Sequence, residues 1–452
     1  MNPSLSDVSP TTAGTATQAL KRGNPALLVT FLCWTMVVFD GYDLTVYGTL
    51  APSLSADWKL SPSITGNLGS AALLGMLFGA IVAGNLADRL GRRWAILLSV
   101  AWFALFNTLC AVALNPTMFA AFRFLGGLGL GGLIPTSSAL SNEYTDRRTR
   151  PLISTLMLSG VPIGGIIAAS LAIPVLPAWG WRPMFWFTLV FAVIIIPLSA
   201  VFLPESAAWL RAKGQTDKAD ALEKRLGVVA TPSPEAGEDH SLDGSKKSGQ
   251  ISRLLRPPYV TTTVLFSFAI LTTYFAWFGL GTWLPSLMRK SGFALGTALT
   301  FTLVLYLGAV LGSLVTGYVG TRAGDLWAGG GAALIGALGL GLLLTHPGTF
   351  MTYVALVLAG IGTHGVQCLI IAAVASRYPH LLRGSALGLI LGVGRIGAVM
   401  APLVGGWLQD AGGGVNSNFV AFGLGPLVAA LLLFTLTQVG LKPHSPHANS
   451  VA

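Results

Sequence analysis

Hydrophobic residues in this chain gather in long blocks, and polar residues are largely confined to the short stretches between them. A helix needs about 20 predominantly apolar residues to cross the hydrocarbon core of a bilayer, and the blocks have about this length. The pattern therefore predicts an all-α integral membrane protein. We expect twelve spans, at residues 27–50, 62–84, 94–114, 117–141, 151–173, 182–203, 259–287, 294–319, 327–345, 348–375, 384–408 and 416–438.

Composition agrees with a membrane protein and gives no sign of an enzyme. Hydrophobic residues make up 53% of the 452 positions and charged residues 10%, whereas about 25% of an average soluble domain is charged. Cys33, Cys110 and Cys368 lie in separate spans without metal-ligand spacing, so we expect neither a disulfide nor a metal site. The chain carries no phosphate-binding loop or Ser/His/Asp array, and we expect no enzyme activity and no cofactor.

The basic residues predict the orientation in the membrane, because cytoplasmic loops collect Lys and Arg. Most of them fall on one side if the N-terminus is cytoplasmic: Lys21, Arg22, Arg89, Arg92, Arg93, Arg147, Arg148, Arg150, Arg322, Arg377, Arg383, Lys442 and those of the central loop. We therefore expect a multi-pass protein of the cell membrane with both termini in the cytoplasm. Anionic lipid accounts for the net charge of +10 without a nucleic-acid partner.

An internal repeat divides the chain into two halves. At an offset of about 233 residues the sequence aligns Gly84 with Gly317, Gly91 with Gly324, and further Gly and Arg pairs. We expect six-helix bundles at 27–203 and 259–438, a solvated central loop at 204–258, and flexible cytoplasmic tails at 1–26 and 439–452. Parallel repeats of this kind bind substrate near the membrane midplane between the halves, which predicts alternating access.

Two carboxylates inside the first span are the main candidates for chemistry. Asp40 and Asp43 are three residues apart and Tyr47 follows four later, so all three line one helical face. A carboxylate in a membrane span costs roughly 2.5–3.5 kcal/mol, and two so close together repel each other, which favours protonation of one. The pair is interpreted as a proton relay. The alternative is a permanently ionised structural pair held by Arg residues.

Two intramembrane arginines are candidate partners for these acids or for an anionic substrate. Arg123 shares a helical face with Gly127 and Gly131, and it could pair with Asp40 or Asp43 or hold a substrate carboxylate. The glycine run lies inside a span and follows no strand, so it is not a dinucleotide-binding motif. Arg395 has no acid nearby in its own half. It is interpreted as an anion ligand or as a side chain reaching toward the lipid interface.

Aromatic and imidazole side chains complete the candidate site. Tyr274, Trp277 and Phe278 share a helical face where they could stack on a flat ring, although plain packing is the other interpretation. His364 could titrate near neutrality, or it could be a hydrogen-bonded packing residue.

The loop at residues 84–93 resembles the G-x-L-A-D-R-x-G-R-R loop of the major facilitator superfamily, which implies a twelve-helix fold of two six-helix repeats. Its glycine predicts close helix approach, and its Asp predicts pairing with an Arg or a helix N-terminus. The equivalent loop of the second half has Thr321 at the position of Asp88. We expect Asp325, at a shifted position, to take the role of this carboxylate. The candidate gating residues are Gly84, Asp88, Arg89, Gly91, Arg92, Glu143, Arg322 and Asp325.

Four further stretches together resemble the aromatic acid:proton symporter family: residues 40–48, 123–144, 203–206 and 394–397. The resemblance implies import of an aromatic carboxylate with protons, with Asp40 and Asp43 in proton coupling. It also implies that Arg123 and Arg395 act in substrate binding or in coupling. The candidate substrate-binding residues are these two arginines and the aromatic side chains of Tyr47, Tyr274, Trp277 and Phe278.

Residues 39–48 are most similar to the benzoate-type members of that family, while 4-hydroxybenzoate, protocatechuate, gentisate and vanillate carriers share much of the pattern. We expect a monomer driven by the proton gradient. A proton-coupled exporter of drugs or organic acids, a carrier of sugars or other organic anions, and a transport-incompetent sensor are the alternatives.

Overall fold

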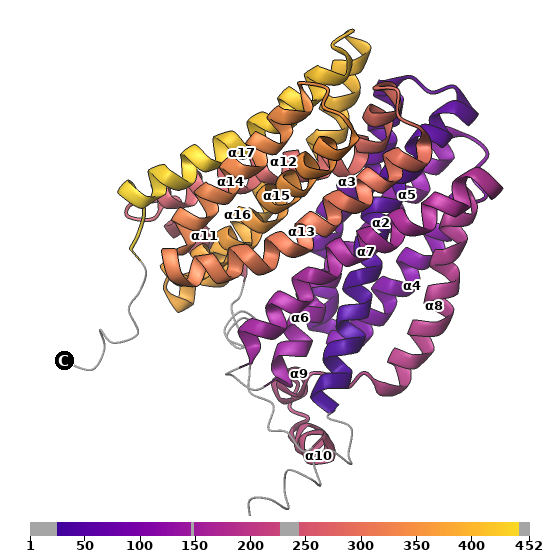
Figure 1. Ribbon diagram of the computed structural model, residues 1–452. Helices are drawn as coiled ribbons and strands as arrows, with labels where there is room; N and C mark the ends of the chain where they lie inside the picture. The colour runs from indigo at the N-terminus through magenta and orange to yellow at the C-terminus, as the bar shows by residue number, and fades with distance from the viewer. Residues whose placement is uncertain (1–24, 146–148, 227–243, 443–452) are drawn as a thin grey trace, which may run out of the picture.

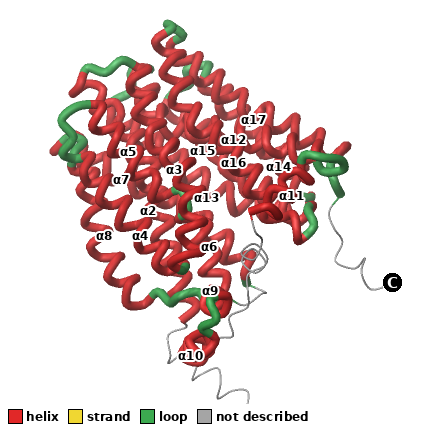
Figure 2. The backbone as a smooth tube through the Cα atoms, turned by 180° about the vertical axis from the view of Figure 1, so that it is seen from behind, coloured by secondary structure: helices red, strands yellow, loops and turns green. Residues whose placement is uncertain are grey.

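The computed structural model describes residues 25–145, 149–226 and 244–442, and within these ranges the chain forms helices joined by short loops (Figure 2). The first half contains α2 (Pro25–Trp58), α3 (Pro62–Leu90), α4 (Arg92–Cys110), α5 (Pro116–Leu130), α6 (Leu133–Glu143), α7 (Arg150–Trp179) and α8 (Pro183–Phe202). The second half contains α12 (Val260–Lys290), α13 (Leu295–Ala323), α14 (Asp325–Leu343), α15 (Thr349–Arg377), α16 (His380–Asp410) and α17 (Gly414–Val439). Twelve segments of the described ranges are long and apolar enough to span a membrane, as predicted, when α5 and α6 count as one.

The first span is longer than the sequence predicts. We expected it to end near residue 50, but α2 has 34 residues and continues through Pro52 to Trp58. At 1.5 Å per residue a helix of that length exceeds a hydrocarbon core of about 30 Å, so its polar end extends past the apolar block. Hydropathy marks where lipid contact ends, and a helix can continue beyond that point.

The fourth predicted span is not one continuous helix. We expected a single helix over 117–141, but α5 ends at Leu130 and α6 begins at Leu133. Gly132 has φ −110° and ψ 1°, which is not helical. Pro135 has no N–H, so it cannot donate the helical hydrogen bond to the carbonyl of Gly131. The break therefore leaves a backbone acceptor in the middle of the membrane-spanning segment.

The predicted repeat is confirmed by matching close contacts in the two halves. A Cβ added to Gly127 would lie 2.1 Å from the carbonyl oxygen of Ala72, and one added to Gly360 would lie 2.3 Å from that of Leu305. Both members of each pair are related by the offset of about 233 residues. The contacts α3 to α5 and α13 to α15 are thus equivalent, and each requires a residue without a side chain.

Part of the stretch that we assigned to a solvated loop is helical. It contains α9 (Ala207–Ala212), α10 (Thr216–Leu226) and α11 (Gly244–Leu254). Arg211 joins α9 to α10 by hydrogen bonds to Asp220 (2.9 Å) and Glu223 (2.7 Å). The predicted tails at 1–26 and 439–452 lie mostly outside the described residues, as do Lys21, Arg22, Arg147 and Arg148.

The two halves pack together at one end and diverge at the other, where α9 lies (Figure 1). At the packed end the Ser63 N–H donates to Asp410 (3.0 Å), and a Cβ on Gly48 would lie 1.8 Å from the Gly281 carbonyl oxygen. At the diverging end, Cβ atoms added to Gly84, Gly317 and Gly388 would meet nothing within 4 Å. Gly84 was expected to permit close helix approach, and in this conformation it does not.

Candidate functional site

Close packing of α2 on α7 holds the acidic pair inside the N-terminal bundle. A Cβ on Gly41 would lie 2.1 Å from the Val161 carbonyl oxygen, and one on Gly164 would lie 2.0 Å from that of Val38. The backbones therefore touch, and Asp40 and Asp43, on either side of Gly41, are 0% and 1% exposed. Ionised carboxylates at this depth need a counter-charge or a proton.

Arg123 supplies the counter-charge to Asp43. Its Nη1 donates to Asp43 Oδ1 and, at 3.2 Å, to the Asn107 side-chain oxygen. Asn107 in turn donates to Thr188 (3.0 Å), so α2, α4, α5 and α8 meet in one polar cluster. Of the two acids that the sequence left open as partners of Arg123, Asp43 is the one it contacts, and the binding of a substrate carboxylate by Arg123 stays a prediction. Asn107 was missed, although an amide inside an apolar span was the available signal.

Tyr47 extends this cluster toward the packed end. Its ring centroid lies 5.8 Å from the Arg123 guanidinium carbon, within the range of a cation–π contact, and its hydroxyl donates to the Thr65 carbonyl (2.5 Å). Asp40, Asp43 and Tyr47 therefore lie on one face of α2, as predicted. Tyr47 serves in this conformation to orient Arg123 and to join α2 to α3.

Asp40 and Arg395 form a second group beside the first. Neither carboxylate oxygen of Asp40 has a hydrogen-bond partner among the described residues, and the nearby charges acting on it are those of Asp43 and Arg395. Arg395 also interacts electrostatically with Tyr274. A buried carboxylate without a partner is the kind of group that binds a proton or a ligand.

Arg395 connects the two halves of the molecule. Its Nη1 donates to the Met76 carbonyl and its Nη2 to the Gly131 carbonyl, each at 2.8 Å. The Gly131 carbonyl is the acceptor that the break before α6 leaves without its helical donor. We expected Arg395 to bind an anion or to reach toward lipid. In this conformation it instead binds two backbone carbonyls of the opposite half.

The aromatic candidates divide into two places. Tyr274 and Phe278 contact each other, with ring centroids 5.6 Å apart. Trp277 is buried between Tyr306 (5.1 Å) and His364 (4.9 Å). Both ring nitrogens of His364 lack a hydrogen-bond partner among the described residues, so the expected hydrogen-bonded packing role is not what the structure shows.

Arg92 and Glu143, two of the gating candidates of the first half, belong to a buried network at the diverging end. Arg92 pairs with Glu143 (3.1 Å), which also accepts from the Ser206 hydroxyl and the Ala208 N–H, each at 2.7 Å. Glu205 accepts from the N–H groups of Arg93 and Ser206 and lies beside Gly91, whose φ of 93° ends α3. Burial raises the pKa of Glu205 above its usual range, against the effect of these donors.

Asp88 and Arg89 sit at the edge of this network. The Asp88 carbonyl accepts from Trp209 Nε1 (3.0 Å), so the loop is joined to α9. Arg89 is exposed, as expected of a residue at the lipid headgroups.

The second half carries a comparable pair with its charges exchanged. Asp325 lies 3.9 Å from Arg377. At the repeat offset of about 233 residues Asp325 corresponds to Arg92, and Arg377 falls within one residue of the position equivalent to Glu143. Asp325 is therefore the counterpart of Arg92 and not a shifted Asp88. Arg322 is exposed and lies over the Tyr318 ring at 4.7 Å.

Comparisons with known proteins agree with this architecture. The family model of the Major Facilitator Superfamily matches residues 33–379 and 294–451. Two solved structures share the fold: an inward open conformation of the xylose transporter XylE from E. coli and a bacterial homologue of the human lysosomal transporter Spinster. Their TM-scores are 0.73 and 0.71, with 16% and 17% identity, covering 94% of this chain and 98% and 99% of theirs.

Curated relatives are more similar in sequence. The gentisate transporter of Corynebacterium glutamicum is 45% identical over 417 residues, which span 91% of this chain and 88% of the relative. The benzoate transport protein of Acinetobacter baylyi is 32% identical over 434 residues, which span 93% and 92%. The gentisate relative is thus more similar than the benzoate relative, unlike the benzoate-type likeness of residues 39–48. The chain is a transporter and not an enzyme, and it belongs to the major facilitator superfamily, where it groups with these two relatives.

Proposed function

We propose that the protein imports an aromatic carboxylate together with protons by alternating access. The observation that carries the proposal is the buried Asp43–Arg123 ion pair next to an unpartnered Asp40 and the inter-half contacts of Arg395. The relatives support the substrate class, because one carries gentisate and another benzoate. A hydroxylated benzoate is the favoured substrate, given the 45% identity to the gentisate transporter.

Protonation of Asp43 would release Arg123 to a substrate carboxylate. An ionised Asp43 satisfies Arg123 through their ion pair, so an entering carboxylate has to compete with it. A proton on Asp43 removes that competitor and leaves a buried guanidinium that needs an anion. Proton and substrate binding therefore assist each other, which is the requirement for symport.

A proton is also required by the energetics of an entering anion. An inside-negative membrane potential opposes one negative charge by about 2.3 kcal/mol per 100 mV. One co-transported proton makes the cycle electroneutral, and a second lets the potential drive uptake. Two carboxylates at the site, Asp40 and Asp43, allow either stoichiometry.

The test is uptake of radiolabelled gentisate and benzoate into proteoliposomes under an imposed pH gradient. We expect the wild type to accumulate substrate against its gradient, and Asp40→Asn and Asp43→Asn to lose accumulation while Asp43→Asn retains exchange. Asp57→Asn is the matched control, because Asp57 lies on the same helix in a half-exposed pair with Arg182.

Full accumulation by both buried-site variants would refute the proton relay. Net movement toward the acidic side would make the protein an exporter. Uptake of sugars in place of aromatic acids would refute the substrate class.

A further inference from the structure

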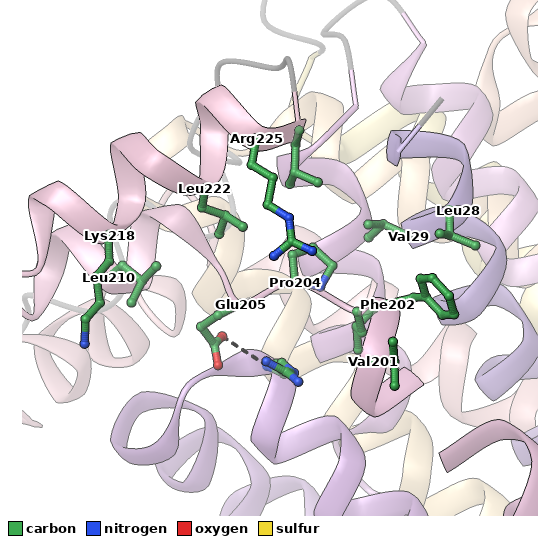
Figure 3. Close-up of a pocket in the computed structure, with 13 residues that line it drawn as sticks. Leu28, Val29, Val201, Phe202, Pro204, Glu205, Leu210, Lys218, Leu222 and Arg225 are labelled. Carbon is green, nitrogen blue, oxygen red and sulfur yellow. Dashed lines mark hydrogen bonds between the residues drawn. The ribbon is translucent and has the colours of Figure 1, made fainter. Parts of the chain in front are cut away.

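A cavity of about 390 Å³ lies outside the proposed transport path, at the diverging end of the N-terminal bundle. It is bounded by the first turns of α2, the last turn of α8 and one face of α10 (Figure 3). The basic residues predict that this end of the molecule is cytoplasmic.

One wall of the cavity is apolar and continues onto the outer surface of the bundle. Val201 and Phe202, in the last turn of α8, are 70% and 51% exposed, and Leu28 of α2 is 39% exposed. They occupy the ends of membrane-spanning helices, where such side chains contact acyl chains near the headgroups.

The opposite wall is basic. Lys218, Leu222 and Arg225 recur at helical spacing on α10, and Arg93 of α4 completes the lining. Figure 3 shows the Arg225 guanidinium pointing from α10 into the cavity, on the side of Pro204 and Glu205. No ion pair between Arg225 and a carboxylate occurs among the described residues.

Among the described residues, one acid lines the cavity, and it does not balance these cations. Glu205 already accepts the backbone N–H groups of Arg93 (3.1 Å) and Ser206 (2.8 Å). Arg93 donates to the Ala200 carbonyl, and Lys218 donates to Gln215 (3.1 Å), neither of which carries a charge. Within the part of the chain that the structure describes, the lining therefore combines three cations with one carboxylate that already has hydrogen-bond donors.

From this combination we infer that the cavity binds the headgroup of an anionic phospholipid, with its phosphate between Arg225 and Arg93 and its acyl chains along Val201 and Phe202, while Lys218 points away from this position (Figure 3). The apolar wall distinguishes this ligand from a free phosphate, which would make no use of exposed side chains in the last turn of a membrane span. The bound lipid would add to the contacts that already hold α10, which are the ion pairs of Arg211 and the packing of Ala219, Leu222 and Leu226 against the N-terminal bundle.

The test is native mass spectrometry of the full-length protein in detergent, titrated with phosphatidylglycerol or with phosphatidylcholine of identical acyl chains. We expect tighter binding of phosphatidylglycerol. Arg225→Gln is expected to lower that preference about fivefold, the effect of removing one cation near an anionic headgroup. Lys224→Gln is the matched control, because Lys224 is exposed on the same helix and does not line the cavity.

Several outcomes would overturn the inference. Equal affinities for the two lipids would exclude an anionic site. Retention of the full preference by Arg225→Gln would place the bound lipid elsewhere. Displacement of phosphatidylglycerol by millimolar glycerol phosphate would identify the ligand as an aqueous anion. Thermal unfolding of the lipid-free variants checks that these exposed substitutions leave the fold intact.

Discussion

The inter-half contacts of Arg395 predict that this residue sets the population of the conformation described here. Among the described residues, three residues of α16 form hydrogen bonds with the first half. In order from the packed end, Asp410 and Val399 accept from Ser63 and Ser70, and Arg395 donates to backbone carbonyls. Arg395 is therefore the innermost link. Arg395→Leu removes two donors to backbone carbonyls of the opposite half.

The magnitude follows from the two bonds. A hydrogen bond from a charged donor contributes roughly 1.5–3 kcal/mol, so the pair contributes about 3–6 kcal/mol. The guanidinium also forms hydrogen bonds with other acceptors when the halves rearrange. We therefore expect the free-energy difference between the two conformations to be about half of the contribution of the two bonds. A bias of about 1.5–3 kcal/mol corresponds to a shift of roughly 10-fold to 150-fold in the ratio of the two states.

Distances between spin labels at the diverging end would measure that ratio. Gly84→Cys on α3 and Gly388→Cys on α16 are suitable, because a Cβ at either position meets nothing within 4 Å. Cys33, Cys110 and Cys368 are first replaced by Ala. We expect Arg395→Leu to enrich the shorter label separation, since it weakens the conformation in which this end is apart.

Two control variants separate the hydrogen bonds from charge alone. Arg395→Lys keeps the charge but lacks the fork that reaches both carbonyls, so its shift should be intermediate. Ser70→Ala removes a neutral inter-half bond to the Val399 carbonyl (2.7 Å) and should shift the ratio less than Arg395→Leu. Identical distance distributions for wild type and Arg395→Leu would refute the reasoning.

Three further predictions concern the substrate site, the helix packing and the gate. His364→Phe should lower gentisate uptake relative to benzoate by about 10-fold, because its imidazole lies beside Trp277, has no hydrogen-bond partner among the described residues and is available to a ring hydroxyl; an unchanged uptake ratio would exclude that role. Gly127→Leu should abolish folded protein in a size-exclusion assay, because its Cβ would overlap a carbonyl of α3, whereas Gly84→Leu meets open space and should fold. Arg92→Gln leaves a buried carboxylate without its cation at a cost of about 3–5 kcal/mol, so it should lower the unfolding temperature far more than Arg89→Gln, at an exposed position.

Sequence alone predicted the features that depend on local pattern or on the repeat. Hydropathy placed the twelve spans, and the offset between halves predicted equivalent packing, later seen at Gly127 and Gly360. Intramembrane charge predicted that Arg123 pairs with Asp40 or Asp43 or binds a substrate carboxylate, because an unpaired charge would be costly in the bilayer, and the structure shows the pair with Asp43.

The sequence could not select among long-range partners. Asp40 and Asp43 lie on one face and are equivalent by spacing, and only the positions of α4 and α5 make Asp43 the partner of Arg123. Arg395 lacked an acid in its own half, and its acceptors turned out to be backbone carbonyls of the other half, which have no residue signature. The ion pair of Asp325 with Arg377 could not be predicted either. The repeat relates the positions of the two pairs, but the acid and the base are exchanged between Arg92–Glu143 and Asp325–Arg377.

The break between α5 and α6 leads to a final prediction, because it connects one proline to the contact between the halves. In a continuous helix the N–H of residue 135 would donate to the carbonyl of residue 131. Pro135→Ala supplies that N–H, and the restored helical bond competes with Arg395 Nη2 for the Gly131 carbonyl. We expect the spin-label distances to shift in the same direction as for Arg395→Leu but by less, because the Met76 bond remains. The double variant Pro135→Ala with Arg395→Leu should match Arg395→Leu alone, since both changes act through one acceptor. Additive shifts would mean that the proline acts on the equilibrium by bending the span and not by freeing the carbonyl.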